Sequence, residues 1–209
     1  MMRYQLRECL IPPYHLPHFG IMKNVFDQEE IDRIRFYEKI LNFEKARTLS
    51  DIQNQNVEDE GKYRTSDIAS MMIDQNTQWL WDKIGHISAK ANYDLFLYDI
   101  NAIEDLNYLI YHGSENGKYV PHRDSQLHGY RRYDRKISGI LMLSDPSEYK
   151  GGELLIDLQA TDSREKWKKA ELEKGDVVFF DSCFTHCVEP VTEGKRQVIV
   201  FWLHGKNKL

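Results

Sequence analysis

From about residue 94 onward the chain is a succession of short apolar segments separated by turn signals, and this pattern limits the fold more than any other feature. The segments are rich in β-branched and aromatic residues, as strands are. They read DLFLYDI, LNYLIYH, KISGILML, GELLIDL, DVVFFD, THCVEPV and RQVIVFWL. The breaks between them fall at Gly113–Gly117, Asp145-Pro146, Gly151-Gly152, Gly175 and Gly194. Such spacing predicts a sandwich or open barrel of mostly antiparallel strands.

The first 93 residues have a different character. Residues 1–24 are punctuated by proline and are expected to be extended. FDQEEIDRIRFYEKILNF then shows helical apolar spacing, and Asp27 with Glu30 forms the pattern of a capping box. NTQWLWDKIGHISAKAN predicts a second helix. We therefore predict one α+β domain over 1–209, in which the N-terminal extended segment and helices (1–93) pack on one face of a β core (94–205).

Composition excludes several classes of protein. Hydrophobic residues make up 41% of the chain, which is enough for a core and argues against disorder. The net charge of −5 is a poor match for nucleic acid, and no apolar run is long enough to span a membrane or to act as a signal peptide. Three cysteines without a CxxC motif indicate reduced thiols and predict a cytoplasmic protein. Cys9 is one of them, and we expect Cys183 and Cys187 to be buried thiols rather than zinc ligands.

His122 and Asp124 form the first half of a candidate metal site. Pro121 disfavours a helix here, and on a strand residues two apart share a face, about 6.6 Å from one another. A third ligand must come from another strand, and His186 follows the apolar segment DVVFFDS. Two imidazoles and one carboxylate are the ligand set of non-haem Fe(II) oxygenases, although zinc would bind the same groups.

Arg196 lies ten residues beyond His186, on the far side of a predicted hairpin, EPVTEGKR. Gly194 suits the positive φ that such a turn requires. Folding the hairpin back places Arg196 opposite residue 188, 189 or 190, roughly 7 to 13 Å along the sheet from His186. A five-carbon dicarboxylate spans that gap, and a guanidinium binds a carboxylate with two charge-assisted hydrogen bonds. An ordinary ion pair with Glu189 or Glu193 is the alternative.

These motifs resemble a known family. The pattern Y-x(7)-Y-x-x-H-x-D, G-G-E-L and H-x-V-x-P-V-T-x-G-x-R-x(5)-W is similar to the 2-oxoglutarate- and Fe(II)-dependent dioxygenases. The segments LMLSDPSEYKGGELLI and HCVEPVTEGKR match the prolyl 4-hydroxylase-like branch, especially its bacterial PKHD-type members. The resemblance covers roughly residues 100 to 204, and upstream only RTSDIA is weakly similar. It implies a double-stranded β-helix, or jelly roll, which agrees with the strand pattern.

The resemblance also implies roles for individual residues. It makes three residues iron ligands: His122, Asp124 and His186. It makes two residues the binding partners of 2-oxoglutarate: Arg196 and Tyr111. On the substrate side we expect a further three: Trp202, Tyr119 and Arg64.

Ordinary structural roles stay open for several of these residues. Tyr111 and Tyr119 can be strand residues with solvated hydroxyls, and Trp202 can belong to the core. Arg64 can form a structural salt bridge with Asp67.

The implied activity is hydroxylation of an unactivated C–H bond, with release of succinate and CO2. The implied cofactors are Fe(II), 2-oxoglutarate as cosubstrate and O2, with ascorbate for sustained activity. A prolyl residue in a peptide or protein is the expected substrate, although relatives in the family also oxidise small molecules. A non-catalytic metal- or ligand-binding module and a zinc hydrolase are the alternatives. Arg196 discriminates between them, because a hydrolase needs no fixed cation one dicarboxylate length from its metal.

Overall fold

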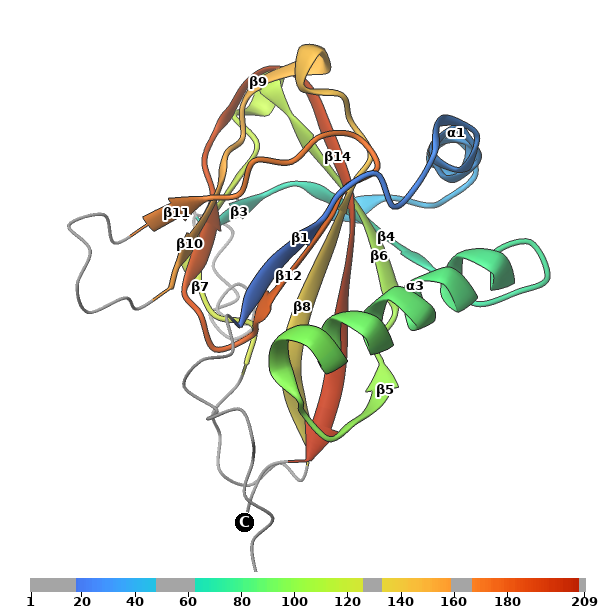
Figure 1. The fold of residues 1–209 in the computed structure, drawn as a ribbon. Helices are drawn as coiled ribbons and strands as arrows, with labels where there is room; N and C mark the ends of the chain where they lie inside the picture. The colour runs from blue at the N-terminus through green and yellow to red at the C-terminus, as the bar shows by residue number, and fades with distance from the viewer. Residues whose placement is uncertain (1–17, 48–62, 126–132, 159–166, 207–209) are drawn as a thin grey trace, which may run out of the picture.

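The computed structural model describes residues 18–47, 63–125, 133–158 and 167–206, and within these the strands form two facing sheets (Figure 1). The larger sheet follows the order β1 (Phe19–Met22), β12 (Val177–Asp181), β8 (Tyr133–Met142), β14 (Val191–Lys206), β6 (Leu106–His112), β4 (Asp67–Met71) and β2 (Glu44–Lys45). Two short strands also pair with β14: β5 (Ile100–Ile103) and β9 (Tyr149–Gly151). The smaller sheet follows the order β11 (Trp167–Lys169), β10 (Leu154–Asp157), β13 (His186–Val188), β7 (Lys118–His122) and β3 (Arg64–Thr65). The pairings are antiparallel, and the arrangement is the predicted double-stranded β-helix.

Both predicted helices are present. Helix α1 (Gln28–Phe36) begins at Asp27 with the predicted capping box to Glu30, and a 3-10 turn (η2, Tyr37–Lys39) follows it. Helix α3 (Gln78–Ala91) lies across the outer face of the larger sheet (Figure 1). None of the helices in the described part of the chain has the length and apolar character needed to cross a membrane.

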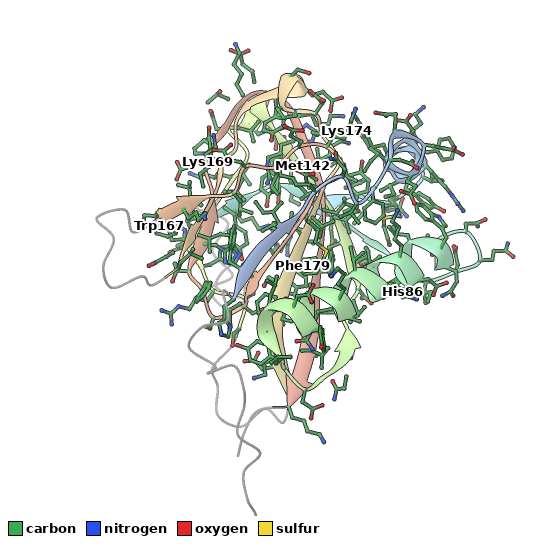
Figure 2. All side chains as sticks on the ribbon, viewed as in Figure 1. His86, Met142, Trp167, Lys169, Lys174 and Phe179 are labelled. Carbon is green, nitrogen blue, oxygen red and sulfur yellow. The ribbon has the colours of Figure 1, made fainter. Side chains whose placement is uncertain are left out.

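Alternation along the strands sorts their side chains into two cores. On β14, Ile199, Phe201 and Leu203 belong to the core that the larger sheet forms with α1 and α3. Phe179, labelled in Figure 2, belongs to the same core. The intervening β14 residues face the other way, into the space between the two sheets, where a second core forms. A polar residue in this inner register is therefore a candidate for a site.

Two segments differ from the sequence prediction. Residues 94–100 were predicted as a strand, but residues 94–96 lie in a π-helical turn that continues α3 (η4, Asn92–Phe96), and of this segment Ile100 alone lies in a strand, at the start of β5. Asn92 closes this turn, because its side chain bonds both the N–H and the carbonyl of Tyr98, and Leu97 adopts a left-handed conformation. In addition, four strands that precede residue 94 join the sheets, where only an extended segment and helices were predicted: β1, β2, β3 and β4. Such pairing depends on partners distant in sequence, which periodicity does not reveal.

Candidate metal centre

The two candidate histidines are neighbours across the smaller sheet. His122 is the last residue of β7 and His186 is the first residue of β13, and the two are directly paired in the antiparallel register. Their ring centroids are 4.2 Å apart. Asp124 lies just beyond the end of β7, where its backbone N–H and that of Ser125 both donate to the carbonyl of Ser182. The loop after β7 is thus tied to the loop that precedes β13.

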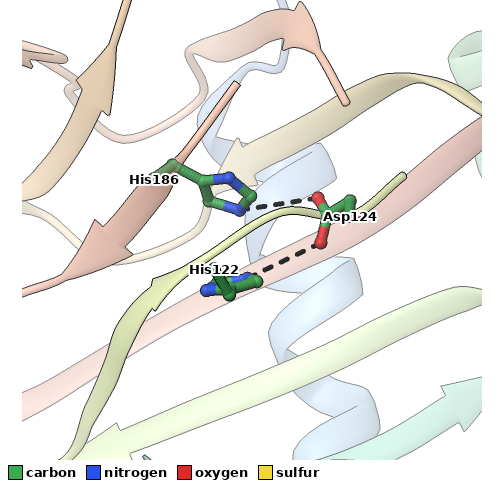
Figure 3. Close-up of side chains that lie close together, drawn as sticks. All are labelled: His122, Asp124 and His186. Atoms are coloured by element: carbon green, nitrogen blue, oxygen red, sulfur yellow. Dashed lines mark ion pairs between the residues drawn. The ribbon is translucent and has the colours of Figure 1, made fainter. Parts of the chain in front are cut away.

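The three side chains converge on one point (Figure 3). Nε2 of His122 lies 3.6 Å from Oδ1 of Asp124, and Nε2 of His186 lies 3.5 Å from Oδ2. The three ligand atoms all lie within 4.8 Å of one another. Each Nδ1 lies near a backbone carbonyl, that of Val120 at 2.9 Å and that of Phe184 at 3.1 Å. Because Nδ1–H donates to these carbonyls, each Nε2 keeps a lone pair for a metal ion.

The charges of the site favour metal binding. Burial by itself would raise the pKa of Asp124, but His186, His122 and a hydrogen bond from Ser138 hold it well below its usual range. Burial lowers the pKa of His186 to about 4, against the opposing effect of Asp124. At neutral pH the site therefore offers a carboxylate and a neutral imidazole, which are the forms that coordinate metals.

Two serines behind Asp124 were missed by the sequence analysis. The hydroxyl of Ser138 donates to Oδ2 of Asp124 at 2.6 Å and lies 2.9 Å from the hydroxyl of Ser182. Both serines are fully buried. Ser138 shares its face of β8 with Ile140 and Met142, which lie in the core between the sheets. A serine among apolar residues on the inward-facing side of a strand is the sequence signal that could have identified Ser138.

Arg196 lies on β14 among residues that face the core between the sheets, and it is 1% exposed. It pairs across the strands with Tyr111 of β6, and its guanidinium carbon lies 5.4 Å from the Tyr111 ring centroid. Its Nε and Nη2 atoms are buried without a hydrogen-bond partner. A buried cation with unpaired N–H groups is costly unless an anion completes it.

The predicted hairpin between His186 and Arg196 is wrong. β13 belongs to the smaller sheet and β14 to the larger, so Arg196 does not oppose residues 188–190. The chain crosses between the sheets after Val188, and the beginning of β14 pairs with β9 instead. Gly194 does adopt the predicted positive φ, of 71°. The alternative ion pair is absent too, since among the described residues no carboxylate pairs with Arg196, and Glu193 pairs with Lys150 at 2.7 Å.

Gly152 makes room for Arg196. Its φ is +69°, and a Cβ added there would lie 2.9 Å from Cδ of Arg196 and 2.7 Å from Cγ2 of Val191. We expect Gly152→Ala to lower the free energy of unfolding by about 1–3 kcal/mol and to displace Arg196. Gly85→Ala is the control, because a Cβ there meets nothing within 4 Å, and it should stabilise α3 by about 0.5–1 kcal/mol. Urea unfolding curves measure both, and equal effects would contradict the account.

The cavity that opens over His122, Asp124 and His186 has a volume of about 560 Å³. The other predicted site residues line it: Arg64, Tyr111, Tyr119 and Trp202. Arg196 lines a second cavity of about 320 Å³, whose walls include Met142 and Lys169, labelled in Figure 2. Leu154 lines both cavities, so this side chain marks the boundary between the metal centre and the guanidinium.

Arg64, Tyr119 and His122 form a stack along the wall of the larger cavity. The Tyr119 ring is stacked on His122 with centroids 3.5 Å apart, and the Arg64 guanidinium lies 4.7 Å from the Tyr119 centroid. Burial raises the pKa of Tyr119 to about 12, so its phenol is neutral. The alternative salt bridge from Arg64 to Asp67 is not formed, because Asp67 pairs with Lys45 and His112.

The sequence analysis predicted Trp202 as a site residue but missed the arginine that stacks on it. Trp202 lines the cavity, and the guanidinium carbon of Arg135 lies 3.6 Å from its ring centroid. Glu104 accepts two hydrogen bonds from Arg135 and approaches His204 Nε2 at 2.6 Å. The charge of Arg135 is therefore compensated within the wall, which the sequence could not show because the partners lie on different strands.

Cys187 is buried as predicted, whereas Cys183 is only half-buried; Cys9 lies outside the described residues. Burial raises the pKa of Cys183 to about 12 and that of Cys187 to about 11, and carboxylates at Asp181 and Glu189 add to these shifts. Little thiolate then exists at mildly alkaline pH. We expect iodoacetamide to label both at least roughly tenfold more slowly in the native protein than in urea, as followed by peptide mass mapping. Equal rates would contradict the burial.

Comparison with known proteins places these features in a family context. Residues 106–204 match the model of the 2OG-Fe(II) oxygenase superfamily. A PKHD-type hydroxylase of Rippkaea orientalis is 32% identical over 139 residues, which are 65% of this chain and 60% of that relative. The chain thus spans less than two thirds of that relative's length.

Two solved structures share the fold. A Pseudomonas putida prolyl-4-hydroxylase superposes with a TM-score of 0.67 at 16% identity, covering 91% of this chain and 94% of that one. A Trichoplax adhaerens prolyl hydroxylase, in complex with a hypoxia inducible factor peptide fragment, gives a TM-score of 0.68 at 18% identity, covering 90% and 83%.

Proposed function

We propose that this chain is a 2-oxoglutarate- and Fe(II)-dependent oxygenase that hydroxylates an unactivated C–H bond and releases succinate and CO2; the match of residues 106–204 to the superfamily model and the similarity to PKHD-type hydroxylases support this. One observation carries the proposal: three metal-binding side chains converge at one end of the space between the sheets, and a buried guanidinium with unpaired nitrogens lies in the same space. A zinc hydrolase or a passive metal-binding module has no use for that guanidinium.

In this proposal the chain's own residues hold and orient the reactants. His122, Asp124 and His186 hold Fe(II), which together with 2-oxoglutarate and O2 supplies the oxidising power. The carbonyls of Val120 and Phe184 fix the two histidine rings in the required tautomer. Ser138 and Ser182 hold the Asp124 carboxylate in its orientation.

Arg196 binds the far carboxylate of 2-oxoglutarate, and Tyr111 lies beside it on the neighbouring strand. The unpaired Nε and Nη2 of Arg196 form one edge of the guanidinium, the geometry that grips a carboxylate with two parallel hydrogen bonds. This role requires the cosubstrate to reach past Leu154, the residue that lines both cavities. The cosubstrate would then neutralise a buried cation that has no carboxylate partner among the described residues.

The substrate we propose is a prolyl residue in a peptide or protein. The peptide complex of the Trichoplax prolyl hydroxylase supports this class, and the relatives named PKHD-type hydroxylases support hydroxylation. The larger cavity is wide enough for a peptide side chain and is walled by Tyr119 and Trp202, whose flat rings suit the apolar face of a proline ring. Arg64 also lines this cavity and offers a polar contact.

A succinate-release screen tests the proposal. Purified protein with Fe(II), 2-oxoglutarate, ascorbate and air is offered proline-containing peptides, free amino acids and nucleobases. The expected result is succinate formed together with a product that has gained one oxygen atom, highest with a proline-containing peptide. Succinate release no greater than that of the Asp124→Ala variant with every compound would contradict the proposal.

A further inference from the structure

The metal cavity carries a local excess of positive charge on an acidic chain. The chain has a net charge of −5, yet the described charged residues that line this cavity outside the metal centre are three arginines and one glutamate: Arg47, Arg64, Arg135 and Glu104. Glu104 is bound to Arg135. No carboxylate of the described residues pairs with Arg47 or Arg64. We call these two the cationic rim.

The cofactors would not compensate the rim. Fe(II) carries two positive charges and 2-oxoglutarate two negative ones, and Asp124 and Arg196 contribute one of each sign. The loaded centre is therefore neutral overall, and among the described residues neither charge of the rim is compensated. A cavity with low-dielectric walls strengthens the attraction of such charges for an anion.

Contacts with Tyr119 and Ser66 hold Arg64 in a fixed position on the cavity wall. Its strand pairs it with Tyr119, and its guanidinium stacks over the Tyr119 ring at 4.7 Å. Its Nε donates to the hydroxyl of Ser66 at 3.0 Å. The two terminal Nη groups are not used by this bond, and they form an end-on fork that fits a carboxylate. The Tyr119 ring that contacts the Arg64 guanidinium is itself stacked on the candidate metal ligand His122.

We propose that the substrate carries a carboxylate close to the carbon that is hydroxylated, and that Arg64 and Arg47 bind this carboxylate in the cavity. The proposal rests on the proposed function and narrows its substrate class to anions. The carboxylate belongs either to an acidic residue beside the target residue or to a free carboxyl terminus. Recognition of this kind selects among proline-containing peptides by charge, which the aromatic walls alone cannot do.

Matched pairs of neutral and anionic probes test the proposal. One pair is N-acetyl-L-proline and N-acetyl-L-prolinamide, which differ in the terminal carboxylate. The other is the blocked tetrapeptide Ala-Pro-Glu-Ala and its Ala-Pro-Gln-Ala counterpart, which differ in a side-chain carboxylate. Calorimetry on the full chain, loaded with Mn(II) and 2-oxoglutarate so that no turnover occurs, gives each dissociation constant. We expect the anionic member of at least one pair to bind roughly tenfold more tightly or better.

The variants identify the residues responsible. Arg64→Gln and Arg47→Gln should each reduce the preference for the anion, and Arg64→Lys should keep part of it because charge remains without the fork. Lys39→Gln removes one exposed positive charge on η2, outside the cavity, and should leave the preference unchanged. Added salt should weaken only the anionic probes.

Two results would overturn the inference. The first is the absence of a preference in both pairs, and the second is a preference that survives in the Arg64→Gln/Arg47→Gln double variant. If 2-oxoglutarate binds the wild-type protein while either result is obtained, only the inference is lost and the proposed function stands. If 2-oxoglutarate does not bind the metal-loaded wild-type protein, the proposed function itself is contradicted.

Discussion

Replacing Asp124 with alanine is expected to abolish 2-oxoglutarate turnover and to weaken Fe(II) binding by at least roughly 100-fold, since even partners of metal ligands contribute 10- to 100-fold. Asp124 is the single carboxylate of the metal centre, and both imidazole Nε2 atoms face it. The fold should survive, because Ser138 keeps Ser182 as a hydrogen-bond partner when the carboxylate is removed. Anaerobic metal titration and succinate release measure the two effects.

Two further variants make this result interpretable. Ser138→Ala keeps the ligand but removes the hydrogen bond that orients it, so an intermediate loss of roughly 10- to 100-fold in metal affinity is expected. Asp82→Ala removes an exposed carboxylate on α3, far from the centre in sequence, and should change neither quantity. Full turnover by Asp124→Ala would rule out the proposed metal centre.

Replacing Arg196 with methionine is expected to weaken 2-oxoglutarate binding by roughly 100-fold, or about 3 kcal/mol, while Fe(II) binding stays intact. Arg196 is 1% exposed and two of its guanidinium nitrogens lack partners, so among the described residues nothing compensates this buried cation in the ligand-free protein. Removing that cation should leave the ligand-free protein as stable as before, or more stable. Loss of binding without loss of stability separates a binding role from a structural one.

Thermal unfolding with and without 2-oxoglutarate measures both consequences. In the wild-type protein, saturating cosubstrate at about 100 times its Kd should add roughly 2.7 kcal/mol of stability. In Arg196→Met this increment should disappear at the same concentration, and Arg196→Lys should retain a fraction of it because a lysine keeps the charge but not the planar fork. An undiminished increment in Arg196→Met would refute the anchoring role.

The sequence predicted that His122, Asp124 and His186 lie close together, and it could do so for a local reason. His122 and Asp124 are two residues apart at the end of a strand, and His186 begins a strand of its own, so only the pairing of those strands had to be supplied by the fold. The helices were predicted for the same reason, since the capping box at Asp27 and the apolar spacing of α3 are local signals.

Partners distant in sequence were the part that could not be predicted. Arg196 was expected in a hairpin with β13, but a chain can turn back or cross to the opposite sheet after the same residues, and here it crosses. Its true neighbour, Tyr111, is 85 positions earlier in the chain and was identified by resemblance alone. Ser138 was missed because a single polar residue in an apolar strand can be assigned to a site only when the side chain that it contacts, here Asp124, is known.

Anaerobic titration of the protein with Fe(II) and 2-oxoglutarate tests the central claim most directly, because the iron chelate of 2-oxoglutarate has a visible charge-transfer band. The band should appear only when both are present, be absent in Asp124→Ala, and require much more 2-oxoglutarate in Arg196→Met. No band in the wild-type protein, or the same band in all three proteins, would contradict the assignment of the metal centre and its cosubstrate.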